Sequence, residues 1–261
     1  MILADTLKSS LAAELALGAT PAAAGASEPE DGPGGVYVPE TAAHWTARGL
    51  PTPLASWACG DASGDLAPLI GSDALVAAGS GLLNGQSVAG WTRKFAGTTG
   101  ASGQRWHSPS AAFSIALNQA WAWLAYASFT SSGSILMLTQ GNTNWGCALG
   151  GTGRLRSAFD GSFLNDTTGP DHSGIGTVHP FLLYRKSNSS TAMGIMTDLR
   201  NYLPVVSSAQ DAITNTGSGF GPPSGNSLAA RLGFLAFWKG ADADLISTRA
   251  ALVALNWTVA W

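Results

Sequence analysis

Apolar residues between Ser56 and Arg231 occur in short runs bounded by glycine, and the spacing of an amphipathic helix is almost absent there. The runs recur about every ten residues, which is the rhythm of strands in a two-layer β-sandwich. The predicted strands cover residues 66–70, 75–78, 90–95, 111–117, 120–129, 134–140, 145–149, 155–159, 180–184 and 192–198.

The last part of the chain predicts a buried strand and one helix. Residues 232–238 are aromatic or aliphatic on both faces, which favours a strand buried between two layers over a half-exposed one. The run ends at Gly240, and Asp242 or Asp244 then caps a short helix over residues 244–255. This ending is typical of a two-sheet jelly roll.

The first 54 residues predict an arm, which leaves residues 55–261 for the sandwich. Residues 2–17 place leucines four apart on a helix-forming background, and residues 19–35 form a linker of Pro, Gly, Ala and acidic residues. Residues 36–54 lead into the sandwich, with a short strand expected over residues 36–39 and an irregular segment over residues 44–53. The short helix packs either on its own domain or on a neighbouring subunit, and both alternatives stay open. The predicted assembly residues are Leu3, Leu7, Leu11 and Leu15.

Composition excludes two classes of partner. Only 11% of the 261 residues are charged and the net charge is −3, so the chain lacks the basic face that nucleic-acid phosphates need. No stretch is long and apolar enough to span a bilayer, so we expect no membrane partner. Asp5, Lys8 and Glu14 interrupt any secretory signal, which predicts synthesis in the cytoplasm.

The chain has two cysteines, Cys59 and Cys147. We favour two buried free thiols that act as small hydrophobic side chains. A disulfide is the alternative, and it would need an oxidising compartment.

Four segments together resemble laminin G-like, concanavalin A-like domains. The first, Ala55-Ser-Trp-Ala-Cys-Gly-Asp-Ala-Ser-Gly-Asp, is a tryptophan strand followed by an acidic turn. The others are residues 113–123, residues 180–185 and the closing residues 232–252. The resemblance covers residues 55–257. It implies an all-β jelly roll of two antiparallel sheets, with about six or seven strands each, packed face to face.

The resemblance does not imply one function, because this fold serves lectins, adhesins, glycosidases and structural modules. Jelly-roll glucanases that resemble this fold carry their paired carboxylates on one strand as Glu-x-Asp-x-Glu. This sequence has no such motif and no glutamate after Glu40. It also lacks zinc spacing among its histidines, a nucleophile elbow and a phosphate loop. We therefore predict no catalytic residues and no enzyme activity.

Residues 160–172 form the strongest candidate ligand loop. Asp160, Asn165, Asp166 and Asp171 can offer oxygens to a calcium ion. Asp and Asn also stabilise turns by bonding their own backbone, and we favour that role here. The Asp-Gly pairs of the family are partly absent, so no metal or cofactor is expected.

Trp145 is the candidate sugar platform. It follows Asn142 and Asn144, which combines an aromatic face with amide donors. The alternative, which we favour, is a core tryptophan.

Two functions follow as hypotheses. The first is a non-enzymatic structural module, which we take to be a phage virion protein (capsid decoration or tail). It would join subunits of the same assembly through its arm, as a homo-oligomer. It would be made in the host cytoplasm and reside in the virion. The alternative is a lectin-like adhesion module that binds surface glycans.

Overall fold

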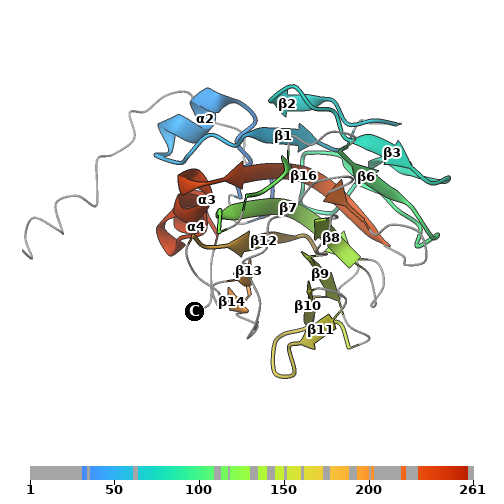
Figure 1. Ribbon diagram of the computed structural model, residues 1–261. Coiled ribbons are helices and arrows are strands. Elements are labelled where there is room, and N and C mark those ends of the chain that lie inside the picture. The colour runs from blue at the N-terminus through green and yellow to red at the C-terminus, as the bar shows by residue number, and fades with distance from the viewer. Residues whose placement is uncertain are drawn as a thin grey trace, which may run out of the picture.

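The computed structural model describes a β-sandwich and the segment that leads into it (Figure 1). It describes residues 31–33, 36–60, 64–108, 113–116, 118–129, 135–139, 145–149, 152–159, 162–172, 177–187, 193–199, 201–202, 219–221 and 229–257. The four leucines of the predicted arm and the predicted linker up to residue 30 lie outside these ranges.

Sixteen strands and three helices are defined in the described ranges. The strands are β1 (Ala55–Ala58), β2 (Pro68–Ile70), β3 (Val76–Ala78), β4 (Leu83–Gln86), β5 (Phe95–Gly97), β6 (Arg105–His107), β7 (Trp121–Phe129), β8 (Ile135–Thr139), β9 (Trp145–Leu149), β10 (Leu155–Phe159), β11 (Ser162–Asn165), β12 (His179–Arg185), β13 (Met193–Thr197), β14 (Asn201–Tyr202), β15 (Gly219–Phe220) and β16 (Ala230–Lys239). The helices are α2 (Ala42–Ala47), α3 (Ala241–Ile246) and α4 (Arg249–Ala254).

The strands form two sheets packed face to face, which confirms the predicted all-β, concanavalin A-like jelly roll (Figure 1). The larger sheet has the order β14-β13-β12-β7-β16-β1-β2, with β5 also paired to β16 and β4 to β5. The smaller sheet has the order β11-β10-β9-β8-β15-β6-β3. The larger sheet has nine strands, more than the resemblance implied, because the short strands β4 and β5 pair beside its main path.

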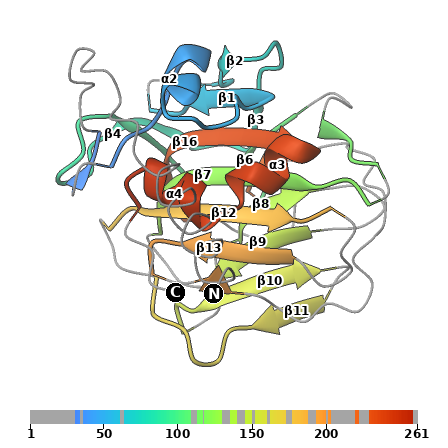
Figure 2. The same cartoon turned by 90° about the vertical axis from the view of Figure 1, so that its left-hand side faces the viewer.

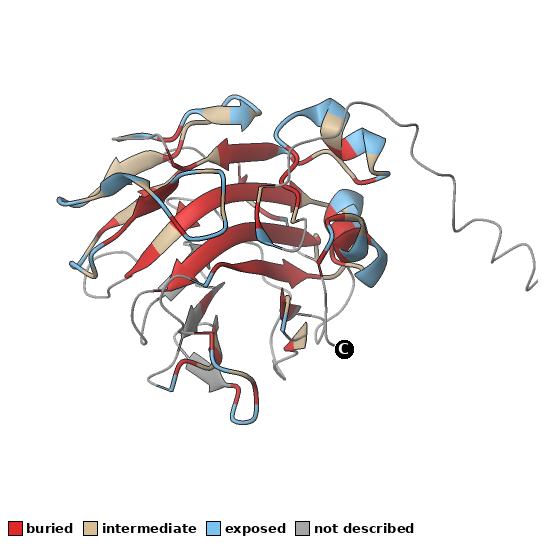
Figure 3. Ribbon diagram, turned by 180° about the vertical axis from the view of Figure 1, so that it is seen from behind, coloured by how far each residue is buried: buried red, intermediate tan, exposed pale blue. Residues whose placement is uncertain are grey.

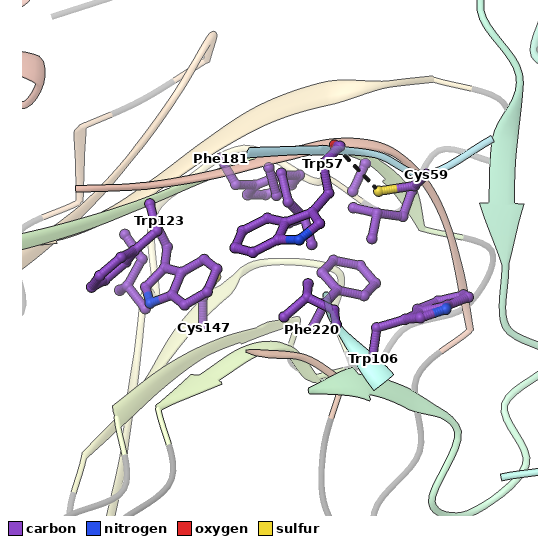
Figure 4. Close-up of a cluster of buried hydrophobic side chains, with 14 of the residues drawn as sticks. Trp57, Cys59, Trp106, Trp123, Cys147, Phe181 and Phe220 are labelled. Atoms are coloured by element: carbon purple, nitrogen blue, oxygen red, sulfur yellow. Dashed lines mark hydrogen bonds between the residues drawn. The ribbon is translucent and has the colours of Figure 1, made fainter. Parts of the chain in front are cut away.

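One hydrophobic core lies between the two sheets. Trp57 stacks on Trp123 with ring centroids 6.0 Å apart, and Phe237 lies 4.7 Å from Trp123. Figure 4 shows this cluster with Cys59 toward one end and Cys147 below Trp123. Both cysteines are buried free thiols, as predicted.

A second core covers the outer face of the larger sheet. Helices α2, α3 and α4 lie on this face (Figure 2), and Trp45 of α2 packs edge-on against Trp238 at 5.2 Å. Strands β7, β12 and β16 are therefore covered on both faces and are buried almost throughout (Figure 3). The prediction of a doubly buried closing strand is confirmed by β16.

A glycine bulge lets β16 supply large side chains to both cores. Leu232 packs between the sheets and Phe234 packs in the outer core, although residues two apart in a regular strand share one face. The pairing with β7 shifts register between these residues, at Gly233. A Cβ on Gly233 would lie 2.7 Å from the ring of Phe95, so a side chain there would force this ring to move.

The end of the chain differs from the single helix predicted over residues 244–255. Two short helices, α3 and α4, take its place, and Thr248 separates them by capping α4 with its side chain. Neither Asp242 nor Asp244 caps α3, because its N-cap is a glycine with no side-chain hydrogen bond. The carboxylate of Asp244 instead accepts hydrogen bonds from the backbone and hydroxyl of Ser187, which docks α3 beside the end of β12.

The lead-in over residues 36–54 differs from the prediction. The segment expected to be irregular contains most of α2 and packs on the sandwich, and the strand expected over residues 36–39 is only an isolated bridge between Val36 and Gly32. Arg93 holds its beginning, since its Nη2 lies 3.3 Å from Asp31 Oδ1 and 3.0 Å from Glu40 Oε1. Trp45 is fully buried. The described part of the predicted arm therefore lies against the domain, and a domain boundary after residue 54 stays a prediction.

Candidate functional site

The outer face of the smaller sheet carries polar side chains on β6. Trp106 is buried between the sheets, whereas Arg105 and His107 are only partly buried, as expected for side chains that alternate across a strand. The indole Nε1 of Trp106 donates to Gly64 O at 3.0 Å, and the buried Gln104 donates to Ser80 O at 2.6 Å. These bonds fix the strand, so the two outward side chains have a rigid base.

Small residues lie on both sides of this polar pair. On β3, Val76 pairs with His107 and Ala78 pairs with Arg105. On β15, Gly219 pairs with His107, and a Cβ on it would clash with the carbonyl of Trp106. Arg105 and His107 therefore lie between short side chains on β3 and a buried glycine on β15.

The two side chains supply complementary hydrogen-bonding groups. Partial burial lowers the pKa of Arg105, but a guanidinium stays charged and presents planar donors. The Nδ1 of His107 lies 3.4 Å from the carbonyl oxygen of Ser108, which only accepts, so Nδ1 carries the hydrogen. In this tautomer Nε2 is an acceptor. The pair can bind a ligand rich in hydroxyl or carboxylate groups.

Strand β10 places a further arginine on the same outer face. Leu155 and Ser157 are buried and Arg156 between them is half buried, so the arginine projects away from the core. Arg156 pairs with Asn165 of β11, one of the predicted ligand residues. Three strands separate β10 from β6, so the two polar groups lie at different ends of this face.

Few of the predicted ligand residues have described side chains. Asn142, Asn144 and Asp160 lie outside the described residues. Trp145 begins β9 and Asn165 ends β11, and neither side chain is among those described. The roles of these five residues therefore stay predictions, although two of them belong to the smaller sheet.

Asp166 has the turn role that we favoured. It is buried, and its Oδ1 accepts from the backbone N–H groups of Thr168 at 3.2 Å and Gly169 at 2.9 Å. Asp171 is exposed. Within the described ranges no three His, Cys, Asp or Glu residues are grouped so that they could hold a metal ion.

A buried histidine network close to this loop was missed by the sequence analysis. His172 bonds to Thr197 at 3.0 Å, and His179 bonds to Asp198 at 2.9 Å. The two imidazole rings lie 5.3 Å apart. No local pattern could have signalled it, because the partners are 25 and 19 residues apart in sequence.

The polar pair on β6 was also missed. Its signal was the polar–apolar–polar order of Arg105, Trp106 and His107, which is the alternation of a half-exposed strand.

No described helix is long and apolar enough to cross a membrane.

The fold is the concanavalin A-like β-sandwich, and comparisons with known proteins agree with it. No protein-family model matches the chain, and no curated protein matches it. Similar solved structures include Trypanosoma rangeli sialidase, at 9% identity and a TM-score of 0.55, covering 77% of this chain and 32% of that chain. The same enzyme in complex with the inhibitor DANA matches at 11% identity and a TM-score of 0.55, covering 79% and 33%. A mutant displaying trans-sialidase activity matches at 7% identity and a TM-score of 0.53, covering 77% and 33%.

These comparisons contradict the prediction that the chain is not an enzyme, because its structural neighbours are enzymes. The prediction depended on the absence of a carboxylate pair. Sialidases are an exception to the two-carboxylate mechanism of glycoside hydrolysis, because they use a tyrosine nucleophile. The likeness shows the fold alone, and the chain spans about a third of the length of these sialidases.

Proposed function

We propose that this chain is a carbohydrate-binding β-sandwich module whose ligand lies on the outer face of the smaller sheet. The observation that carries the proposal is the likeness in fold between this chain and about a third of the sialidase chain. Sialidases are enzymes named for their action on a sugar. A sandwich of this size is large enough to be one binding module of a longer carbohydrate-active protein.

The chemistry of the β6 face supports this assignment. Sugars offer arrays of hydroxyl groups that both donate and accept. Arg105 supplies several donors in a fixed plane, and His107 supplies Nε2 as an acceptor, since its Nδ1 donates to Ser108 O. Val76 and Ala78 on the neighbouring β3 have short, partly buried side chains, so they leave room for a sugar ring beside Arg105 and His107.

The distribution of the helices also supports the smaller sheet. All three described helices pack against the outer core of the larger sheet, so that face is occupied by the chain itself (Figure 2). The outer side chains of β3 and β6 remain half exposed. Two of the predicted ligand residues, the candidate sugar platform Trp145 and the loop residue Asn165, also belong to the smaller sheet.

Attachment to a larger assembly through the N-terminal segment is a second proposal. Its support is the fixed position of Asp31, which Arg93 and the backbone N–H of Val38 hold against the sandwich. The thirty residues before Asp31, with the predicted leucine stripe, start from this anchored point. A phage virion role, homo-oligomerisation and a laminin G-like ancestry belong to this second proposal.

A glycan array followed by isothermal titration with the strongest ligand tests the first proposal. Arg105→Ala removes the planar donors, and we expect affinity to fall at least about tenfold, as for loss of a charged hydrogen bond. Arg105→Lys should recover only part of the affinity, because an ammonium group has no planar fork. Arg249→Ala, on exposed α4 over the other sheet, is the matched control and should bind as the wild type does.

Two results would contradict the proposal. One is the absence of any glycan that binds the folded protein. The other is a bound glycan whose affinity is the same for the wild type, Arg105→Ala and His107→Ala, which would remove the β6 face as the site.

A further inference from the structure

Residues 166–172 tie the two sheets together at the edge where β10 and β13 approach. The backbone N–H of Asp166 donates to Leu155 O at 2.8 Å, and that of His172 donates to Gly153 O at 2.9 Å. Both acceptors belong to β10 or the turn before it. The side chain of His172 reaches across to Thr197, the last residue of β13 in the larger sheet. One buried imidazole therefore links the loop to both layers.

The hydrogen bonds of His172 fit a neutral ring of one tautomer. Its Nδ1 lies 3.1 Å from Pro170 O, and a carbonyl can only accept, so Nδ1 carries the hydrogen. Its Nε2 then accepts from the hydroxyl of Thr197 at 3.0 Å. The same hydroxyl oxygen accepts from the backbone N–H of Leu199 at 3.1 Å. A proton on Nε2 would reverse this bond, because the Thr197 oxygen would then have to accept from Nε2 as well as from the Leu199 N–H, and its own hydrogen would lose its acceptor.

Some groups around His172 lower its pKa and others raise it. The ring has no exposed surface. Burial, first, and then the neighbouring His179 lower the pKa of His172 from 6.5 to about 4, while Asp198, the Pro170 carbonyl and Asp171 act to raise it. Arg154, which donates to Thr167 O, adds a further cation to the same loop. The net environment favours the neutral ring.

We propose that His172 is an acid-sensitive latch, whose protonation releases residues 166–172 from β13 and opens this edge of the sandwich while the rest of the domain stays folded. This device is independent of carbohydrate binding. The direction of the pH dependence follows from linkage between proton binding and opening. His172 takes up a proton near pH 6.5 when the loop is open and only near pH 4 when the loop is closed, so acid favours the open loop. The latch is therefore fully closed above pH 6.5 and is lost progressively as the pH falls toward 4.

The two buried cysteines report local and global opening separately. Cys147 lies on β9, paired with Ser157 of β10, in the smaller sheet that the loop closes. Cys59 follows β1, and its N–H donates to Gly233 O at 3.1 Å at the other end of the cluster (Figure 4). Burial raises the pKa of both thiols, that of Cys147 to about 12. Neither thiol should react until its part of the core opens.

Labelling with 4,4′-dithiodipyridine, which reacts with thiols in acid, tests the latch. Rates at each pH are divided by the rate of glutathione, and peptide mass spectrometry assigns the cysteine. The pKa of His172 is 6.5 when the loop is open and about 4 when it is closed, so one proton is taken up on opening. This difference predicts that the labelling of Cys147 rises roughly twentyfold from pH 7 to pH 5. Cys59 should be labelled more slowly than Cys147 throughout this range.

Three variants identify the titrating group. His172→Gln should flatten the pH dependence of Cys147 labelling. Thr197→Val removes the hydroxyl from the latch and should raise Cys147 labelling at pH 7 about fivefold, the effect of one net hydrogen bond. His107→Gln, which changes a half-buried histidine outside the loop, should keep the wild-type profile.

Equal labelling of Cys147 and Cys59 at every pH would mean that acid opens the whole domain, which overturns the proposal. An unchanged pH profile in folded His172→Gln would do the same, because the titrating group would lie elsewhere. If His172→Gln does not fold, Thr197→Val decides, and Cys147 labelling equal to that of the wild type at pH 7 contradicts the latch.

Discussion

Replacing Trp45 by alanine tests whether the lead-in belongs to the folded domain. Trp45 has no exposed surface and packs edge-on against Trp238 at 5.2 Å and tilted against Phe234 at 6.5 Å. It is the buried residue of α2, so it carries most of the contact between this helix and the larger sheet. If residues 36–54 were a detached arm, this change would leave the sandwich unaffected.

The expected cost follows from burial. Removing a buried tryptophan side chain usually destabilises a domain by about 3–5 kcal/mol, since the lost contacts leave a cavity. For a domain of this size, each kcal/mol lowers the melting temperature by about 2–4 °C, so we expect a fall of roughly 10 °C. No described group accepts from its indole Nε1. Trp45→Phe keeps an aromatic ring and removes the unpaired N–H, so it should cost less than Trp45→Ala.

Thermal unfolding followed by near-ultraviolet circular dichroism measures both changes. Thr46→Ala, on the exposed face of the same helix, is the control and should stay within about 0.5 kcal/mol of the wild type. A melting temperature of Trp45→Ala within about 2 °C of the wild type would refute the reasoning, because α2 would then add almost nothing to the domain.

Three further predictions concern the N-terminal segment and metals. Arg93→Met leaves the partly buried carboxylate of Asp31 without this ion pair and should lower the free energy of unfolding by roughly 1–3 kcal/mol in urea titrations, whereas an unchanged midpoint would show that the anchor is dispensable. Leu7→Asp with Leu11→Asp should abolish self-association on a sizing column and leave the melting temperature unchanged; a lower melting temperature with unchanged association would instead place the leucines on their own domain. Removal of divalent ions with EDTA should leave the melting temperature within about 1 °C, and a fall of about 10 °C would reveal a structural ion.

The sandwich could be predicted because its strands carry strong local signals. Residues 232–238 have no polar position, and a strand with two apolar faces must be covered on both. The structure covers it with the smaller sheet and with three helices. The free, buried state of Cys59 and Cys147 was also predictable, since a small apolar side chain suits such a core.

The parts that could not be predicted depend on single residues or on distant partners. Helix α2 has one buried side chain, Trp45, and so has no apolar period to detect. Strand β6 has only three residues, which is too short for its alternation to stand out. The link between His172 and Thr197 spans 25 residues of sequence and exists only once two sheets are packed. Asp244 accepts from Ser187 instead of capping its own helix, and this bond also depends on a partner that is distant in sequence.

Mapping a bound glycan by amide chemical shifts tests the central claim most directly. The strongest ligand from the array is titrated into isotope-labelled protein, and the shifts of each backbone amide are followed. The account predicts that the largest shifts cluster on β3, β6 and β15, around Arg105, His107 and Gly219. Shifts confined to the helices over the larger sheet, or saturable binding that leaves β6 unperturbed, would contradict the assignment of the site.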